Sequence, residues 1–148
     1  MKLLWLSLHL VCAGAWLGCV LTEALFERTL LDRGTDAMLT LARLHRRVDL
    51  MVEIPAFAAV LLTGLFMWPI APTSSVWLWA KVGFGALAIS ANLWCVRLVF
   101  RRVVVAEAGD WRAFAQIDQA QHRWGAVVLL AILVALGLGV WLLAGGVH

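Results

Sequence analysis

The sequence predicts an all-α fold: a polytopic membrane protein built as an up-down-up-down bundle of four transmembrane helices that extend into the cytoplasm. Four stretches, residues 3–25, 50–69, 76–96 and 124–144, are almost wholly apolar, and each approaches or exceeds the ~20 residues that cross a hydrocarbon core. Hydrophobic residues make up 64% of the chain and charged residues 14%, whereas soluble domains average roughly 45–50% and roughly 25%. Because four such helices use up the 148 residues, we expect a single domain over residues 1–148.

The basic residues fall almost entirely at two of the three connections. Those at the first and third connections are Arg28, Arg33, Arg43, Arg46, Arg47, Arg97, Arg101, Arg102, Arg112 and Arg123. The second connection, residues 69–75, and the C-terminal tail have no Lys or Arg, and only Lys2 and Lys81 lie elsewhere. The positive-inside rule therefore places the first and third connections in the cytoplasm and both termini on the outer, periplasmic face of a bacterial inner membrane. This pattern also explains the net charge of +3, so we expect the lipid bilayer, and no nucleic acid, as a partner.

Turn residues indicate where the helices end. Gly34 interrupts the first charged connection, and Thr35 or Asp36 can cap the helix that follows. Gly109-Asp110 divides the third connection, with the aspartate as the cap of a helix that begins at Trp111. The sequence between these turns and the apolar spans is compatible with helix, so we expect helices of ~28–36 residues, each antiparallel to the next along the chain.

Two histidines are predicted to lie at the same height near the cytoplasmic edge of the membrane. His45 lies about 11 residues beyond the first cytoplasmic turn and His122 about 12 beyond the third, at 1.5 Å per residue. They belong to the second and fourth helices, which are diagonal in this topology. Two imidazoles so placed can clamp a heme iron from both faces through neutral ring nitrogens. The alternative is that both are interfacial histidines among arginines.

Acids spaced four residues apart lie near these histidines. The stripes on single helix faces are Glu23 and Glu27; His45, Asp49 and Glu53; and Asp118 and His122. Mixed carboxylate and imidazole groups that project into a bundle suit a zinc, manganese or iron ion. For Glu27, Asp49 and Asp118 we favour the alternative that they pair with nearby arginines. Glu23 and Glu53 lie deeper in apolar sequence, where an ionisable residue indicates function.

A second pair of polar residues lies in the outer half of the membrane. His9 in the first helix and Lys81 in the third are predicted at similar depth on diagonal helices. Together they could bind one anionic, planar cofactor, with the histidine on its metal and the lysine on a carboxylate. The alternatives are a hydrogen-bonded core histidine and a lysine that extends to the outer surface.

Short motifs resemble a known family. They are His9 with Trp16 seven residues later, Arg47 eight residues before Pro55, Trp77-Leu78-x-x-Lys81, and Arg97. The chain is similar in these motifs to the HemJ-type membrane protoporphyrinogen oxidases, and in its span pattern to the wider group that includes the copper-resistance protein D family. The resemblance implies a four-helix protein with heme b, with His9 as the heme ligand and Lys81 as an essential residue. Asn92 stands where the oxidases would have a histidine, and His45 and His122 do not match their pattern.

The first functional hypothesis is a heme b-binding membrane protein that performs redox chemistry or electron transfer. One or two hemes would be held at the two histidine sites, with Arg46 and Arg47 beside the propionates. A quinone or another membrane redox partner would exchange electrons with the iron. If the protein is an oxidoreductase acting on a porphyrinogen, Glu23 and Glu53 are the expected catalytic proton acceptors.

Two other classes stay open. A copper or zinc transport or resistance protein would hold a bare ion with His45, His122, Glu23 and Glu53, although the chain has only four methionines and no methionine track for cuprous ion. An assembly subunit of a larger membrane complex would use its polar residues for helix contacts. Stretches of small residues suit close helix packing in either class, including packing in a homo-oligomer.

Overall fold

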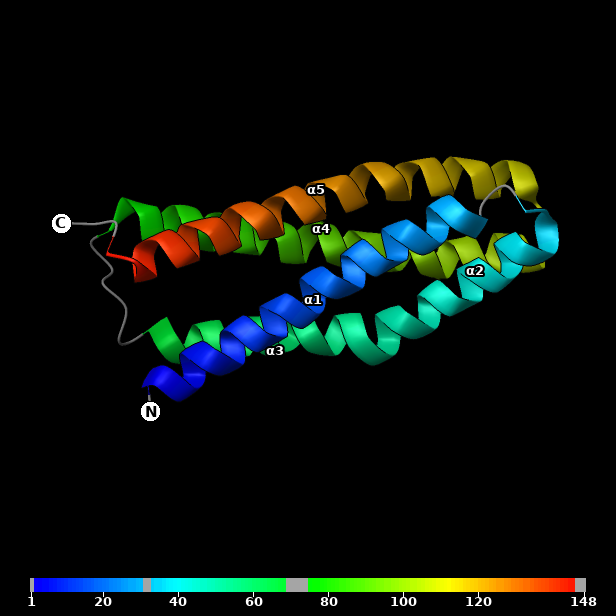
Figure 1. The fold of residues 1–148 in the computed structure, drawn as a ribbon. Coiled ribbons are helices and arrows are strands. Elements are labelled where there is room, and N and C mark those ends of the chain that lie inside the picture. Colours follow the sequence, from blue (N-terminus) through cyan, green and yellow to red (C-terminus); the bar gives the residue numbers. More distant parts are fainter. Residues whose placement is uncertain (1, 31–32, 69–74, 146–148) are drawn as a thin grey trace.

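The structure, a computed structural model, describes residues 2–30, 33–68 and 75–145. Its elements are α1 (Lys2–Leu30), α2 (Thr35–Val48), the π-helical segment η1 (Asp49–Glu53), α3 (Ile54–Met67), α4 (Val76–Glu107) and α5 (Trp111–Leu143). Because α2, η1 and α3 are continuous, these described ranges form four long helical rods and contain no strand (Figure 1). All four rods are long and apolar enough to cross a membrane, so the predicted all-α four-helix bundle is confirmed.

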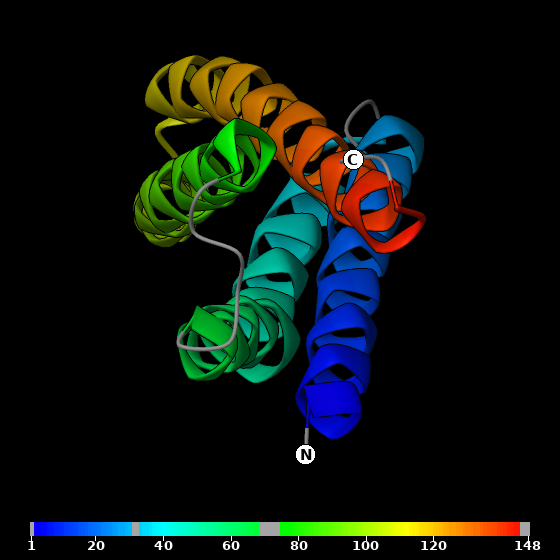
Figure 2. The ribbon, with the colours of Figure 1, turned by 90° about the vertical axis from the view of Figure 1, so that its left-hand side faces the viewer.

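The rods pack as two antiparallel pairs that meet along part of their length. The closest pair is α4 with α5, and α1 packs along α3 (Figures 1 and 2). The two pairs are joined where α2 contacts α4 and α1 contacts α5. The rods therefore follow one another around the bundle in chain order, which makes the second and fourth rods diagonal, as the sequence analysis expected.

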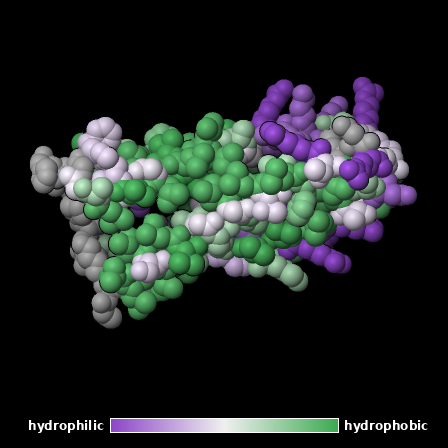
Figure 3. Space-filling model, viewed as in Figure 1, coloured by the Kyte–Doolittle hydropathy of each residue, from purple (hydrophilic) through white to green (hydrophobic). Residues whose placement is uncertain are grey.

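Polar and apolar surfaces separate along the bundle axis. One end, where α1 leads to α2 and α4 leads to α5, gathers the hydrophilic surface and is called the charged end below (Figure 3). Every arginine is exposed except Arg102. Along the remaining length, large apolar side chains such as Leu61, Leu65 and Leu130 are exposed, as expected for helices that face lipid.

Glycines make both turns at the charged end. Gly34 and Gly109 adopt φ of 97° and 72°, a left-handed conformation that a residue with a Cβ rarely adopts. Asp110 caps α5 as predicted, because its side chain accepts a hydrogen bond from the Ala113 backbone N–H at 3.0 Å. The expected cap of α2 by Thr35 or Asp36 is wrong: the glycine itself occupies the N-cap position, without a side-chain cap.

Some sequence predictions concern residues outside the described ranges. These include residues 69–74 of the second connection, with the predicted end of the second span, and the C-terminal residues 146–148. Within the described ranges, the main apolar core lies where all four rods approach. The Trp16 and Phe57 rings pack there at a tilt of 53° with their centroids 5.8 Å apart, and small residues such as Ala88, Ala91 and Ala131 let the helices come close.

Candidate metal centre

Buried ionisable side chains gather where the apolar core meets the charged end. This group, called the polar cluster, comprises Glu23, Glu27, His45, Asp49, Glu53, Arg102 and Asp118, each 9% exposed or less. Its members come from α1, α2, η1, α4 and α5. Because α2 and η1 belong to the same rod, all four rods contribute to this one site. Such a concentration of buried charge is costly inside a membrane protein unless the charges balance.

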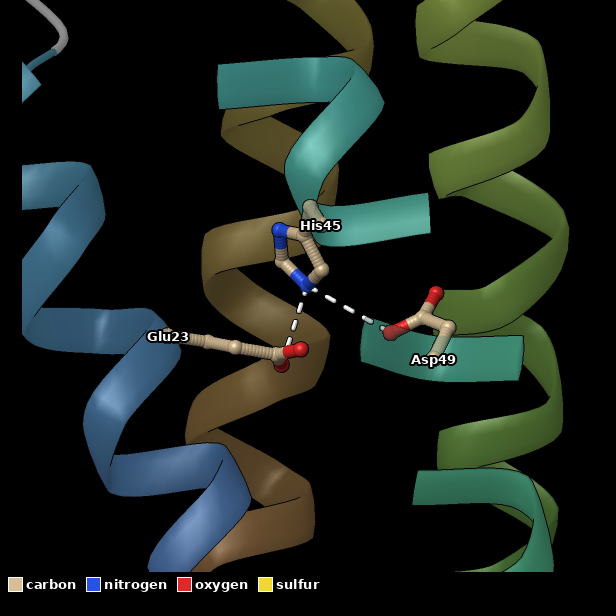
Figure 4. Close-up of side chains that lie close together, drawn as sticks. All are labelled: Glu23, His45 and Asp49. Carbon is tan, nitrogen blue, oxygen red and sulfur yellow. Dashed lines mark ion pairs between the residues drawn. The ribbon is translucent and has the colours of Figure 1, made fainter. Parts of the chain in front are cut away.

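Three members of the polar cluster converge from two rods (Figure 4). His45 Nε2 lies 3.0 Å from Glu23 Oε2 and 3.7 Å from Asp49 Oδ1. One donor atom from each residue lies within 4.8 Å of the other two. In a tetrahedral site with bonds of about 2.05 Å, neighbouring donor atoms are about 3.3 Å apart. The three side chains are therefore close to the spacing that a single metal ion would impose.

The π-helical segment brings the acids onto the same face as the histidine. Pro55 has no N–H, and in a regular α-helix its ring would collide with the carbonyl of Met51. The chain widens into η1 immediately before this proline, and the rod changes direction between α2 and α3 (Figure 1). In a regular α-helix of 3.6 residues per turn, the side chains four and eight residues after His45 are rotated around the helix axis by about 40° and about 80° relative to it. The wider turn of a π-helix reduces this rotation. His45, Asp49 and Glu53 therefore all face the interior.

The other edge of the His45 ring faces Glu27 and Gln121. His45 Nδ1 lies 3.3 Å from Glu27 Oε1 and 3.2 Å from Gln121 Nε2. Both ring nitrogens thus have a carboxylate oxygen close by, an arrangement that suits either a protonated imidazole or an imidazole bound to a cation. Gln121, which is 5% exposed, was not among the site residues predicted from the sequence.

Arg102 is the buried cation of the polar cluster, and it was not among the site residues predicted from the sequence. One nitrogen, Nη1, lies 2.6 Å from Glu27 Oε1, 2.9 Å from Gln121 Oε1 and 3.1 Å from Asp118 Oδ1. The guanidinium carbon also lies 5.1 Å from the centre of the Phe114 ring. The predicted pairing of Glu27 and Asp118 with an arginine is therefore present, and a buried arginine, instead of an exposed one, makes it.

Asp49 differs from these paired acids. It is 1% exposed, and neither of its carboxylate oxygens has a hydrogen-bond partner among the described residues. The expectation that it pairs with an arginine is wrong, because η1 turns it toward His45 and Glu23 in the interior. A buried carboxylate oxygen without a donor carries a large desolvation penalty unless it is protonated or a cation binds it.

The balance of charge in the polar cluster is negative. It brings five carboxyl groups together with one guanidinium and His45, and His122 lies 3.3 Å from Glu27. With every carboxylate ionised, the group carries two unbalanced negative charges if both imidazoles are protonated and four if both are neutral, so it favours a bound cation. A cavity of about 220 Å³ adjoins the cluster, lined by Glu23, Asp49, Glu53, Asn92 and Cys95 among others.

The two histidines predicted to clamp a heme do not face each other. Glu27 stands between them: Oε1 lies 3.3 Å from His45 Nδ1, and Oε2 lies 3.3 Å from His122 Nε2. The adjoining cavity of about 220 Å³ is also smaller than the ~300–1,000 Å³ typical of pockets for drug-sized ligands. The residues present therefore do not fit a heme between these histidines. Arg46 and Arg47, predicted beside the propionates, are exposed, and Arg46 lies over the Phe100 ring at 5.3 Å.

His9 and Lys81 lie apart from the polar cluster. The Thr63 hydroxyl donates its hydrogen to the Ala59 carbonyl at 2.6 Å, so it accepts from His9 Nδ1 at 2.9 Å. This leaves His9 Nε2 as the nitrogen with a free lone pair. The Lys81 side chain packs against α5 at Gly139. A Cβ atom added to this glycine would lie 2.9 Å from the lysine Cε. The histidine is thus placed between α1 and α3, and the lysine between α4 and α5.

No known protein family, curated protein or solved structure matches this chain. The resemblance to the HemJ-type oxidases therefore stays a prediction from short motifs.

Proposed function

We propose that this protein binds a divalent transition-metal ion inside the membrane bundle, with Glu23, His45 and Asp49 as ligands. Zinc, manganese and iron are the ions that accept this combination of one imidazole and two carboxylates. Glu53, the next acid along the same face, supplies a further carboxylate beside the ion. A function in metal transport or resistance is the class that this site supports best.

The observation that carries the proposal is Asp49, a fully buried carboxylate without a hydrogen-bond donor that faces a histidine and a second acid. Glu27, by contrast, accepts a hydrogen bond from Arg102 at 2.6 Å. The excess negative charge of the polar cluster supports the same conclusion. We further propose, from the arginine distribution, that the charged end faces the cytoplasm, so that the site exchanges its ion on that side.

The test is metal stoichiometry and affinity of the purified protein. After chelator treatment in detergent, titration with Zn²⁺ should show one ion per chain. His45→Ala and Asp49→Asn should each lower the affinity by at least about tenfold, since each removes a ligand. His9→Ala is the matched control, a half-buried histidine elsewhere in the bundle, and should leave Zn²⁺ binding unchanged. The absence of bound zinc, or equal binding by all three variants, would overturn the proposal.

Heme b with His9 as the axial ligand is a second proposal. Its support is the free Nε2 lone pair that the hydrogen bond to Thr63 leaves on His9. The heme would supply one-electron chemistry, and a quinone or another membrane partner would complete the reaction. A b-type absorption spectrum that is lost in His9→Ala and kept in His45→Ala would support it. A colourless protein after expression with ample heme precursor would refute it.

A further inference from the structure

The cavity beside the polar cluster opens between α1 and α5. Its lining includes four exposed residues, which are Ala24 and Arg28 of α1 and His122 and Ala126 of α5. Its deepest residues, including Asp49 and Glu53, are 1% and 3% exposed. An ion that reaches the proposed site from the surface would therefore pass between these two helices.

The hydrogen bond of His122 leaves one nitrogen available at this mouth. Nδ1 lies 2.9 Å from the Asp118 backbone carbonyl, which can only accept, so Nδ1 carries the proton. Nε2 then points at Glu27 Oε2, 3.3 Å away. The His122 side chain is 48% exposed and that of Glu27 is 7% exposed, so the pair spans the boundary between the surface and the buried cluster.

Glu27 links this pair to the deep site. Arg102 and His45 lie 2.6 Å and 3.3 Å from Oε1, so this oxygen is already engaged, while Oε2 faces the mouth. From His122 inward, donor atoms follow one another through Glu27, His45 and Glu23 at separations of 3.3 Å, 3.3 Å and 3.0 Å. The mouth and the deep site are thus lined by carboxylate and imidazole groups along one and the same cavity.

We propose that His122 and Glu27 form an entry site, where a divalent cation first binds before it moves to Glu23, His45 and Asp49. This inference rests on the proposed function and adds the route by which the ion reaches the site. The entry site has too few protein ligands to hold the ion at equilibrium, so it lowers the barrier to entry and exit and leaves the final affinity unchanged. Arg28, the cation at the mouth, is exposed and can extend its long side chain into solvent.

The test measures rates of metal binding separately from affinity. Stopped-flow mixing of the detergent-purified protein with Co²⁺, followed by visible absorption, gives the association rate, and chelator chase gives the dissociation rate. His122→Ala should slow both by on the order of tenfold with little change in Kd. Arg123→Ala, the neighbouring exposed position, is the matched control and should leave both rates unchanged. Asp49→Asn should instead weaken Kd.

The outcomes separate this inference from the proposed function. Unchanged rates in His122→Ala would overturn the entry site while the metal site stands. A weakened Kd with an unchanged association rate would make His122 a ligand of the final site, which also overturns the inference. Failure of the unsubstituted protein to bind Co²⁺ and Zn²⁺ would overturn the proposed function and this route together.

Discussion

Replacing Arg102 with methionine should destabilise the metal-free protein more than any other single loss of charge. The guanidinium is 1% exposed and contacts Glu27, Gln121 and Asp118 at 2.6, 2.9 and 3.1 Å. Removing one partner of a buried ion pair costs roughly 3–5 kcal/mol, because the acid that stays behind is buried and unpaired. Methionine can still pack against Phe114, so little of the loss comes from an empty cavity. We therefore expect a destabilisation of about 3–5 kcal/mol.

Reversible unfolding in mixed micelles, driven by SDS and followed by tryptophan fluorescence, measures this difference. Arg46→Met is the matched control: its arginine is exposed over Phe100, and its loss should cost less than about 1 kcal/mol. Adding Glu27→Gln to Arg102→Met should recover part of the stability, since the unpaired carboxylate is removed. A loss of stability in Arg102→Met as small as that in Arg46→Met would refute the role assigned to Arg102. A double variant no more stable than Arg102→Met would refute it as well.

Four further outcomes follow from the structure. Gly139→Ala should change the stability of the bundle by less than about 1 kcal/mol, because its Cβ would lie 2.9 Å from the Cε of Lys81, the far end of a flexible side chain that can move aside; a loss above about 2 kcal/mol in the same unfolding assay would contradict this. Pro55→Ala should let η1 relax toward an α-helix and weaken Zn²⁺ binding about tenfold by calorimetry, whereas unchanged affinity would show that the π segment does not position the ligands. Zinc binding near pH 7 should release protons, because zinc displaces them from its ligands. The number of protons released is measured by calorimetry in buffers of different ionisation enthalpy. Identical binding enthalpies in all buffers would contradict the expected proton release. Ala108→Cys, at the exposed end of α4, should react with a membrane-impermeant thiol reagent only when the cytoplasmic face is accessible; labelling of intact cells would reverse the proposed orientation.

The fold was predictable because its signals are local. Four apolar runs of bilayer length define the rods, and Gly34 and Gly109 stand at the turns because the chain needs a positive φ there. Short connections then make consecutive rods antiparallel neighbours, which places the second and fourth on a diagonal. Within the described ranges the cap of α2 was misplaced, since a turn glycine can serve as N-cap without a side-chain hydrogen bond.

The site was only partly predictable because it depends on contacts between rods. Spacing in the sequence correctly placed His45, Asp49 and Glu53 on one face, but the inward direction of Asp49 depends on the π segment before Pro55. That proline, in the middle of an apolar span, was the available signal.

Arg102 shows a second limit. Residue type does not distinguish it from the adjacent, exposed Arg101, and only its position on the buried face of α4, three and seven residues after Val99 and Cys95, indicates burial. The separation of His45 and His122 by Glu27 carries no sequence signal, because depth along a helix does not specify which side chain lies between two others.

X-ray absorption at the zinc edge, on protein loaded with a single equivalent of Zn²⁺, identifies the atoms that bind the ion. Coordination by Glu23, His45 and Asp49 predicts nitrogen and oxygen neighbours at about 2.0–2.2 Å, with imidazole scattering that disappears in His45→Gln. A sulfur neighbour at about 2.3 Å would instead place the ion on Cys19 or Cys95, and imidazole scattering retained in His45→Gln would show that another histidine binds it. Either result would contradict the proposed metal centre.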